Sequence, residues 1–343
     1  MSDWKEYKLG EVITIKYGKD HKGLKDGPYP VYGSGGIMRY AENYLYDKES
    51  ILIPRKGSLS NIFYQDKAFW TVDTMFWSII DETKVFPKFL FYLLTLVDFE
   101  NLNVGSAVPS LTIPIINDID ISLPPLSEQK RIASILSSLD DKIDLLHREN
   151  KTLEAMAETL FRKWFIEEAK EDWGIITLEN LIDIGSGKCL QRSDFIENGI
   201  YPVLGANGVI GRTDKYLVDE DMRLIFTGRV GTLGNIFRLE NKKAWLSDNT
   251  LIIKPKNYYN FVYFTLRLAK LQDYNVGSTQ PLIRQSDIKQ IEIAFPNETI
   301  LNKFEAQCVK IYKKINSNNN QIQTLTQQRD SLLPKLMSGE VKI

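Results

Sequence analysis

The segment LSSLDDKIDLLHRENKTLEAMAETL, residues 136–160, decides the fold because its apolar residues return every seven positions. One seam position of the heptad carries Leu136, Ile143, Asn150, Ala157 and Trp164, and the other carries Leu139, Leu146, Leu153 and Leu160. This spacing is typical of a long helix that packs along one face against another helix. The pattern predicts a helix of about 38 residues, which at 1.5 Å per residue makes a rod of about 55 Å.

A second segment after Pro296 repeats this pattern. Its seam positions carry Leu301, Cys308, Ile315, Ile322, Arg329 and Leu336 on one side, and Phe304, Ile311, Asn318, Leu325 and Leu332 on the other. Residues 126–172 have a net charge of −3 and residues 297–343 one of +3, which favours pairing the two helices with each other. Because the second helix must return toward the first domain, we expect an antiparallel intramolecular coiled coil.

The ends of the two helices also correspond. Residues 160–165 align with residues 332–337, so we expect each tail to dock on a domain in an equivalent way. Three polar residues, Asn150, Asn318 and Arg329, interrupt the apolar seams. They either specify the register of the pair, or that of a partner helix, or are polar residues tolerated near water.

The segments on either side of the first helix are two copies of one unit. Tyr29-Pro30-Val31 and Gly33 return 172 residues later as Tyr201-Pro202-Val203 and Gly205. Further repeated pairs keep the same order, among them Trp4 with Trp173, Leu9 with Leu178, Gly18-Lys19 with Gly187-Lys188, Asn61-Ile62-Phe63 with Asn235-Ile236-Phe237, and Val104-Gly105-Ser106 with Val276-Gly277-Ser278. Two copies in one chain imply pseudo-twofold symmetry, which suits the gripping of two related targets.

Local patterns predict an α+β fold in which both copies are β-rich. Short β-branched runs such as Val12–Ile15, Ser50–Ile53 and Leu251–Ile253 indicate strands separated by long Gly- and Asn-containing loops. One stretch in each copy, Lys88–Leu94 and Asn260–Leu266, predicts a core helix. We expect domains at residues 1–125 and 173–296 and helical regions at residues 126–172 and 297–343.

Composition limits the class of protein. The chain of 343 residues is 43% hydrophobic and has a formal net charge of −1, which is not the footprint of a strongly electrostatic DNA-binding protein. A tight nucleic-acid function would need a basic cleft or positive surface from a second protein. Cys189 and Cys308 lie far apart, and the start MSDWKEYK has no apolar signal core, so we expect a cytoplasmic protein without a membrane segment.

The sequence offers poor candidates for catalysis. His21 and His147 are the only histidines, so no histidine cluster can hold a metal. Gly185-Ser186-Gly187-Lys188 resembles the end of a phosphate loop but lacks the earlier glycine and is followed by Cys189 rather than Ser or Thr. Pro124-Pro125 is followed by Leu126, so the Pro-Pro-Tyr or Pro-Pro-Phe tetrad of an amino-methyltransferase is missing. We therefore predict no catalytic residues and no metal site.

The candidate binding residues lie instead in polar, glycine-rich loops that repeat in position while their polar residues differ. Such loops are either ordinary turns or two equivalent surfaces that read different sequences, because Arg, Asn and Gln can hydrogen-bond to base edges. The candidates in the first copy are Lys19, Ser34, Arg39, Arg55, Lys56, Ser58, Asn61, Ser106 and Ser110. Those in the second copy are Lys188, Asn207, Arg212, Arg229, Thr232, Asn235, Ser278, Gln280 and Arg284.

Over nearly its full length the chain resembles the specificity subunits of type I restriction-modification systems. Three signatures carry the resemblance: Pro124-Pro125-Leu126-Ser127-Glu128-Gln129-Lys130-Arg131-Ile132 opening the first helix, Leu160-Phe161 with Trp164-Phe165 closing it, and the ending Leu332-Leu333-Pro334-Lys335-Leu336-Met337-Ser338-Gly339-Glu340. One departure is that the second helix opens Phe295-Pro296-Asn297-Glu298, without the Glu-Gln pair, which puts equivalent partner contacts there in doubt.

The resemblance implies two target recognition domains that read the two halves of a bipartite, asymmetric site in double-stranded DNA. The conserved helical regions would set the spacer and hold two modification subunits. The chain itself would be non-catalytic and bind no cofactor. S-adenosylmethionine, Mg and ATP would belong to partner subunits, which include a restriction and translocation subunit where the system has one.

Two other classes of protein remain as alternatives. One is a self-contained restriction-modification enzyme, against which the missing methyltransferase tetrad counts. The other is a two-domain coiled-coil scaffold without a DNA role. Protection of DNA by the purified chain together with a methyltransferase partner would distinguish them.

Overall fold

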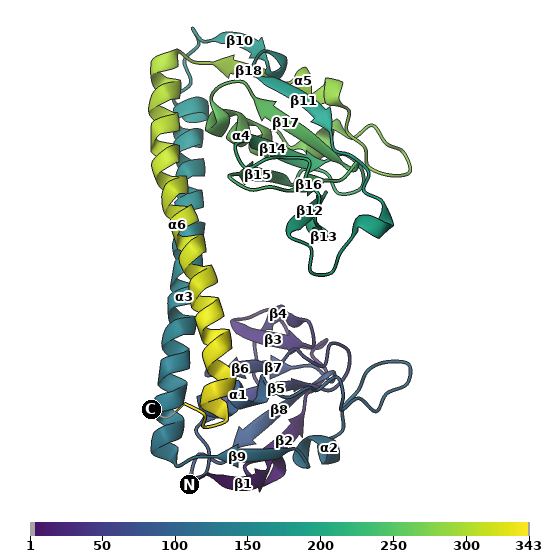
Figure 1. Cartoon of the computed structure of the whole chain (residues 1–343), viewed down its shortest axis with the longest axis vertical. Helices are drawn as coiled ribbons and strands as arrows, with labels where there is room; N and C mark the ends of the chain where they lie inside the picture. The colour runs from purple at the N-terminus through teal and green to yellow at the C-terminus, as the bar shows by residue number, and fades with distance from the viewer. Residues whose placement is uncertain (1–3, 342–343) are drawn as a thin grey trace. The chain divides into compact units, whose positions relative to one another are not determined.

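The computed structural model describes residues 4–341 and divides into two compact units. Unit 1 comprises residues 1–146 and 320–343, and unit 2 comprises residues 147–319. Both long helices contribute one part to each unit. These helices are α3, Leu126–Arg162, and α6, Glu298–Met337 (Figure 1).

The β-rich part of unit 1 contains three sheets, in the strand orders β2-β8-β5-β6, β4-β3-β7 and β1-β9 (Figure 1). Its strands are β1 (Lys5–Lys8), β2 (Ile13–Tyr17), β3 (Tyr29–Gly33), β4 (Gly36–Ala41), β5 (Ser50–Pro54), β6 (Phe63–Gln65), β7 (Trp70–Thr71), β8 (Met75–Ile80) and β9 (Asp120–Leu123). The helical elements are the 3-10 turn η1 (Leu9–Glu11), α1 (Pro87–Leu94) and α2 (Ile113–Asn117). All strand pairs are antiparallel except β3 with β7.

Unit 2 repeats this topology as β11-β17-β14-β15, β13-β12-β16 and β10-β18. Its strands are β10 (Gly174–Thr177), β11 (Ile182–Ser186), β12 (Tyr201–Gly205), β13 (Gly208–Thr213), β14 (Arg223–Gly228), β15 (Ile236–Glu240), β16 (Trp245–Leu246), β17 (Thr250–Pro255) and β18 (Glu292–Phe295). Its helical elements are η2 (Lys163–Glu167), η3 (Leu178–Asn180), η4 (Arg192–Asp194), α4 (Tyr259–Leu268), η5 (Leu271–Tyr274) and α5 (Gln285–Lys289). The repeat includes the parallel pair β12 with β16 and a register shift between Val203 and Leu204 that matches the one between Val31 and Tyr32.

The predicted elements are confirmed. The runs Val12–Ile15, Ser50–Ile53 and Leu251–Ile253 lie in or extend into β2, β5 and β17, and the expected core helices are α1 and α4. Helix α3 starts directly after Pro124-Pro125 and spans 37 residues, and α6 spans 40 residues. The two helices run antiparallel within each unit, as the charge difference and chain direction predict (Figure 1).

The ends of both helices are part of the domain cores. In unit 2 the Phe161 ring lies between 5.1 and 5.8 Å from the rings of four other phenylalanines, and all five belong to one buried cluster. In unit 1 the buried Leu336 and Met337 join the cluster that contains Phe89 and Leu136. Leu332, Leu333 and Trp4 pack against the same cluster. The predicted equivalent docking of the two tails is therefore confirmed.

The polar seam residues pair with one another across the helices. In unit 2 the Asn318 side chain is fully buried, and its Nδ2 donates to Asn150 Oδ1 (2.9 Å) and Glu149 Oε2 (3.0 Å). In unit 1 Arg329 forms an ion pair of 3.0 Å with Asp140. These contacts support register specification within the chain, since a shift along the seam would separate the buried Asn318 amide group and the partly buried Arg329 from their partners.

Within residues 4–341 no helix is both long and apolar enough to span a membrane.

Both cysteines are free thiols; Cys189 is exposed, and burial raises the pKa of the Cys308 thiol to about 12.

Replacing Phe161 by Ala should lower the free energy of unfolding by about 3–5 kcal/mol, because a buried phenylalanine leaves a cavity when it is truncated. The loss would be measured by urea denaturation of the full chain. Met156→Ala on the same helix is the matched control; its side chain is 51% exposed, so a change within about 0.5 kcal/mol is expected. Equal losses in the two variants would contradict the role of Phe161.

Candidate nucleic-acid interface

In unit 1 two of the predicted loops are tied together by backbone hydrogen bonds. One loop follows β5 and the other precedes α2. The N–H of Gly57 donates to the carbonyl of Pro109 (3.0 Å), and that of Leu111 donates to the carbonyl of Arg55 (2.9 Å). The two loops therefore form a single structural element, although about 50 residues separate them in the sequence.

The β3–β4 hairpin joins the same surface. Asn61 Nδ2 donates to the carbonyl of Ser34 at the tip of this hairpin (3.0 Å). Lys56 and Ser110 form an isolated bridge between the two loops. The structure thus brings four of the predicted residues, Ser34, Lys56, Asn61 and Ser110, into one loop cluster.

Unit 2 repeats these backbone contacts. The N–H of Gly231 donates to the carbonyl of Pro281 (2.9 Å), and that of Ile283 donates to the carbonyl of Arg229 (3.1 Å). The side-chain contacts at the hairpin differ. Asn207 Nδ2 donates to Thr232 Oγ1 (3.0 Å), and Asn235 Nδ2 donates to Asn207 Oδ1 (3.1 Å). The two clusters therefore share a backbone scaffold and carry different polar groups.

An asparagine that was not among the predicted residues organises each cluster. Asn103 Oδ1 accepts the N–H groups of Gly105 (2.7 Å) and Ser110 (2.8 Å), and Asn275 Oδ1 accepts two N–H groups of the matching loop at 3.0 and 2.9 Å. The signal was present in the sequence, because this asparagine precedes the repeated Val-Gly-Ser in both copies. Its side chain shapes the loop and so does not need to contact a ligand.

Lys19 and Lys188 occupy equivalent positions after the first strand of each large sheet. The carbonyl of Lys19 accepts the indole N–H of Trp70 (2.9 Å), and that of Lys188 accepts the indole N–H of Trp245 (2.8 Å). Both lysines are exposed. The backbone is fixed while each ammonium group remains available at the surface.

Arg39 and Arg212 are engaged within their own units. Arg39 donates to the carbonyl of Leu24 (3.1 Å) and forms an ion pair with Asp26 (2.6 Å). Arg212 donates to two backbone carbonyls of the preceding loop, at 2.6 and 2.8 Å. In this structure both guanidinium groups attach the β-hairpin to the loop before it.

Arg55 and Arg229 differ from each other in their contacts. The Arg55 guanidinium donates to the carbonyl of Asp73 (3.0 Å) and lies 5.5 Å from the ring centre of Tyr17. The Arg229 side chain is exposed and has no hydrogen-bond, ion-pair or ring partner among residues 4–341. Of the two aligned arginines, Arg229 is the one that is free to contact a ligand.

The remaining predicted residues lie on the surface of the same two clusters. Exposed residues are Lys56, Ser58, Ser106, Thr232, Ser278, Gln280 and Arg284, and Ser110 is half-buried. A hollow of about 700 Å³ adjoins the unit 1 cluster, and Asp20, His21, Ser34 and Thr74 are among the residues that line it. Each cluster thus combines a polar surface with glycines that allow close backbone approach.

The second long helix, α6, opens without the Glu-Gln pair of α3, and a different residue takes the structural role of Gln129. Gln129 of the Glu-Gln pair is buried and its Oε1 accepts the N–H of Phe86, which caps α1 (2.7 Å). Near the start of α4 in unit 2, Glu305 accepts the N–H of Phe261 (2.9 Å) and the side-chain amide of Asn260 (2.6 Å). Burial raises the pKa of the Glu305 carboxyl, although these hydrogen bonds oppose the shift. Gln129 thus attaches the start of α1 to α3, and Glu305 attaches the start of α4 to α6.

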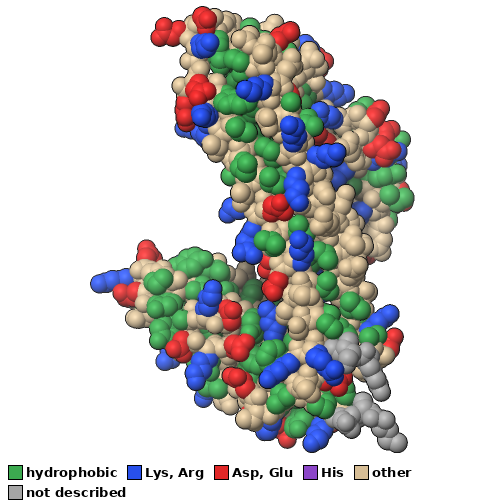
Figure 2. Space-filling model, turned by 90° about the vertical axis from the view of Figure 1, so that its left-hand side faces the viewer, with side chains coloured by type: hydrophobic (Ala, Val, Ile, Leu, Met, Phe, Trp, Pro, Cys, Tyr) green, Lys and Arg blue, Asp and Glu red, His purple; other side chains and the backbone are tan. Residues whose placement is uncertain are grey.

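The surface shows charges of both signs, as the formal net charge of −1 leads one to expect. On the face shown in Figure 2, Lys and Arg side chains are interspersed with Asp and Glu side chains. No group of three or more His, Cys, Asp or Glu side chains placed to hold a metal ion is found among residues 4–341.

Comparison with known proteins identifies the family of this chain. The family described as type I restriction modification DNA specificity domain matches residues 1–155 and 170–328, one match for each copy of the repeat. The MjaIX specificity subunit of a type I restriction enzyme from Methanocaldococcus jannaschii is 28% identical over 346 residues, covering 87% of this chain and 79% of the relative. The HindI specificity subunit of Haemophilus influenzae is 23% identical and covers 99% of this chain and 100% of the relative.

A solved structure shows the same fold. The crystal structure of the S subunit of a type I restriction-modification system from M. genitalium has a TM-score of 0.66 with 19% sequence identity. The match covers 98% of this chain and 96% of that chain.

Replacing Gly277 by Ala should disrupt the unit 2 cluster, because the added Cβ would lie 1.8 Å from the carbonyl oxygen of Gln280. We expect a local destabilisation of more than about 1 kcal/mol, seen as faster hydrogen exchange of the amides in residues 275–283. Gly185→Ala is the control, since nothing lies within 4 Å of its added Cβ. Unchanged exchange in Gly277→Ala would mean that the loop tolerates another conformation.

Proposed function

The chain belongs to the type I restriction modification DNA specificity family, and on this basis we propose that it is the non-catalytic subunit that selects the DNA sequence for a type I restriction-modification complex. Each loop cluster would read one half of a bipartite site in double-stranded DNA. The observation that carries the proposal is the pair of loop clusters with equal backbone hydrogen bonds and different polar side chains.

The physical argument follows from how base pairs are distinguished. A constant scaffold gives the loops the same backbone arrangement in both units, and exchangeable Arg, Asn, Gln, Ser and Thr side chains can present different donor and acceptor patterns to base edges. Arg229 is the strongest candidate for a bidentate contact with guanine, since its guanidinium has no competing partner in the described part of the chain.

The formal net charge of −1 argues that phosphate neutralisation is shared with other subunits. We propose that two methyltransferase subunits bind through the helical regions and carry S-adenosylmethionine chemistry. Mg and ATP would be bound by a restriction subunit where the system has one. Cytoplasmic residence follows from this role in acting on DNA.

The decisive experiment is to purify the chain, reconstitute it with its methyltransferase partner and sequence the methylated adenines in genomic DNA. We expect no methylation by the chain alone and methylation of one bipartite motif by the complex. Methylation by the rigorously purified chain would favour a self-contained enzyme. A complex that methylates no defined motif would favour a scaffold without a DNA role.

Arg229→Ala and Arg284→Ala should each relax base preference in the half-site read by unit 2 and cost about 1–3 kcal/mol in binding, if the arginine forms a bidentate contact with guanine. The measurement is the motif methylated by each reconstituted variant. Equal loss across both half-sites would instead indicate a phosphate contact, with a flatter salt dependence. An unchanged motif would return the residue to a structural role in its turn.

Inserting one heptad into α3, with a matching heptad in α6 to keep the helices in register, should lengthen the spacer of the methylated site. Seven residues add about 10 Å to a helix, or about three base pairs at 3.4 Å each. The spacer would be read from the methylated motif of the reconstituted complex. An active variant with an unchanged spacer would contradict a measuring role for the helices.

A further inference from the structure

Unit 2 buries an arginine in a cage of aromatic side chains. The guanidinium carbon of Arg238, on β15, lies 3.3 Å from the ring centre of Tyr312 and 4.9 Å from those of Tyr259 and Tyr263. An ion pair of 2.6 Å joins Arg238 to Glu240, and the Arg238 side chain is only 13% exposed. Burial works to lower the pKa of Arg238, but Tyr312 and Glu240 more than offset it, so the guanidinium remains charged.

The equivalent position in unit 1 carries a tyrosine. Arg238 lies opposite Ile225 on the neighbouring strand β14, and Tyr64 lies opposite Ile51 on the corresponding strand β5. Both residues follow the repeated Asn-Ile-Phe, so the register and the sequence give the same correspondence. Unit 1 therefore has no arginine on β6 where unit 2 has one on β15, and the arginine that reaches the same region, Arg329, comes from α6 and pairs with Asp140 and Asp330.

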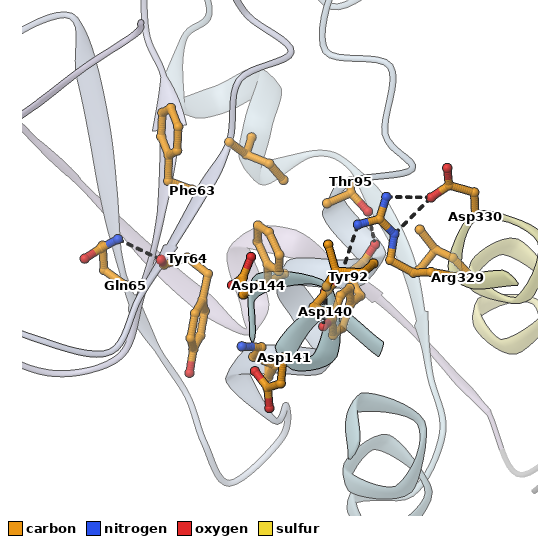
Figure 3. Close-up of a pocket in the computed structure, with 15 residues that line it drawn as sticks. Phe63, Tyr64, Gln65, Tyr92, Thr95, Asp140, Asp141, Asp144, Arg329 and Asp330 are labelled. Carbon is orange, nitrogen blue, oxygen red and sulfur yellow. Dashed lines mark hydrogen bonds and ion pairs between the residues drawn. The ribbon is translucent and has the colours of Figure 1, made fainter. Parts of the chain in front are cut away.

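A cavity of about 650 Å³ lies beside Tyr64 in unit 1. We call it the aspartate pocket and define it by Tyr64, Phe91, Tyr92, Asp140, Asp141 and Asp144; Lys88, Arg329 and Asp330 also line it. Figure 3 labels Arg329 and Asp330 beside the three aspartates of α3. The ring of Phe91 corresponds to that of Tyr263 in the cage of unit 2, and Asp140 corresponds to Tyr312. The pocket thus occupies the place of the arginine cage.

The aspartate pocket of unit 1 carries negative charge where the cage of unit 2 holds the positive charge of Arg238. Asp140 accepts hydrogen bonds from Tyr92 (2.6 Å) and Arg329 (3.0 Å), so its charge is already compensated. Asp141 and Asp144 are exposed and form no ion pair within the described part of the chain. The matching positions of α6 in unit 2 are Lys313 and Asn316, 172 residues later. The exposed carboxylates Asp141 and Asp144 therefore have no acidic counterpart at the matching positions of unit 2.

Lys88 does not replace the missing guanidinium. Its ammonium group lies 4.7 Å from the ring centre of Tyr64, so it covers one side of that ring. An ammonium group is a compact charge, whereas a planar guanidinium can stack on Phe91 and donate to two carboxylates at once. The lining of the aspartate pocket therefore suits a second cation of the guanidinium type.

We propose that the aspartate pocket binds the guanidinium group of an arginine side chain supplied by another protein chain. The arginine would stack against the aromatic wall formed by Tyr64 and Phe91 and pair with Asp144 and Asp141 at the rim, as Arg238 does internally with its rings and Glu240. This site is distinct from the loop clusters, and the proposal does not depend on DNA recognition.

The probe is N-acetyl-L-argininamide, which presents an arginine side chain without charged termini, titrated into the full chain and followed by NMR. We expect saturable binding with a Kd of about 1 mM, the range expected for a single side chain. The neutral isostere N-acetyl-L-citrullinamide should not bind. Equal binding of the two compounds, or no saturable binding of the arginine compound, would overturn the proposal.

Two variants locate the binding. Tyr64→Arg transfers the arrangement of unit 2 into unit 1 and should abolish binding by filling the pocket. Asp144→Asn removes one exposed carboxylate and should weaken binding about fivefold, while Glu171→Gln, an exposed control, should leave it unchanged. Because Asp144 is at the surface, this variant is expected to fold even if Tyr64→Arg does not. Unchanged binding in Asp144→Asn would overturn the proposal.

Two further ligands distinguish the source of the cation. Free L-arginine and spermidine should bind no better than N-acetyl-L-argininamide if the pocket receives a side chain within a polypeptide. Tighter binding of free L-arginine would indicate a metabolite site, and tighter binding of spermidine would indicate a polyamine site. Either result would overturn the assignment to a protein partner.

Discussion

The burial of the helix ends in the domain cores is the constraint on which the rest of the structure depends. In unit 2 the rings of Phe161 and Phe304 lie 5.8 Å apart and bring α3, α6 and the β-rich part into one cluster. In unit 1 Leu336 and Met337 do the same from the end of α6. Because apolar contacts alone would permit sliding, the polar pairs Asn150–Asn318 and Asp140–Arg329 fix the register.

Features with a local or repeated signature could be predicted from the sequence. The heptads predict α3 and α6, the β-branched runs predict β2, β5 and β17, and the repeats predict that the two units share a topology. What could not be predicted are contacts whose partners lie far away in the chain. Nothing local indicates that Arg329 pairs with Asp140, or that Gln129 caps α1.

The loop clusters illustrate how a duplicated surface can vary without losing its shape. The Asn103 and Asn275 side chains, together with the paired loop hydrogen bonds, fix the backbone in both units. The shape therefore depends on backbone hydrogen bonds and on these two asparagines, and the other polar residues of the loops are free to differ. The same separation explains why Gly33 and Gly36 repeat as Gly205 and Gly208, while Ser34 and Gly35 are replaced by Ala206 and Asn207.

The composition of the two units has a consequence for the order of folding during synthesis. Residues 147–319 of unit 2 are continuous, whereas unit 1 joins residues 1–146 to residues 320–343. The β-rich part that leaves the ribosome first must therefore keep the apolar surface around Phe89 and Leu136 uncovered until Leu336 and Met337 have been made. Domains usually fold as units in order of synthesis, and exposed apolar surface invites aggregation. Unit 1 can therefore be completed only after unit 2 has been made, and its last step closes a loop of more than 170 residues between residues 146 and 320.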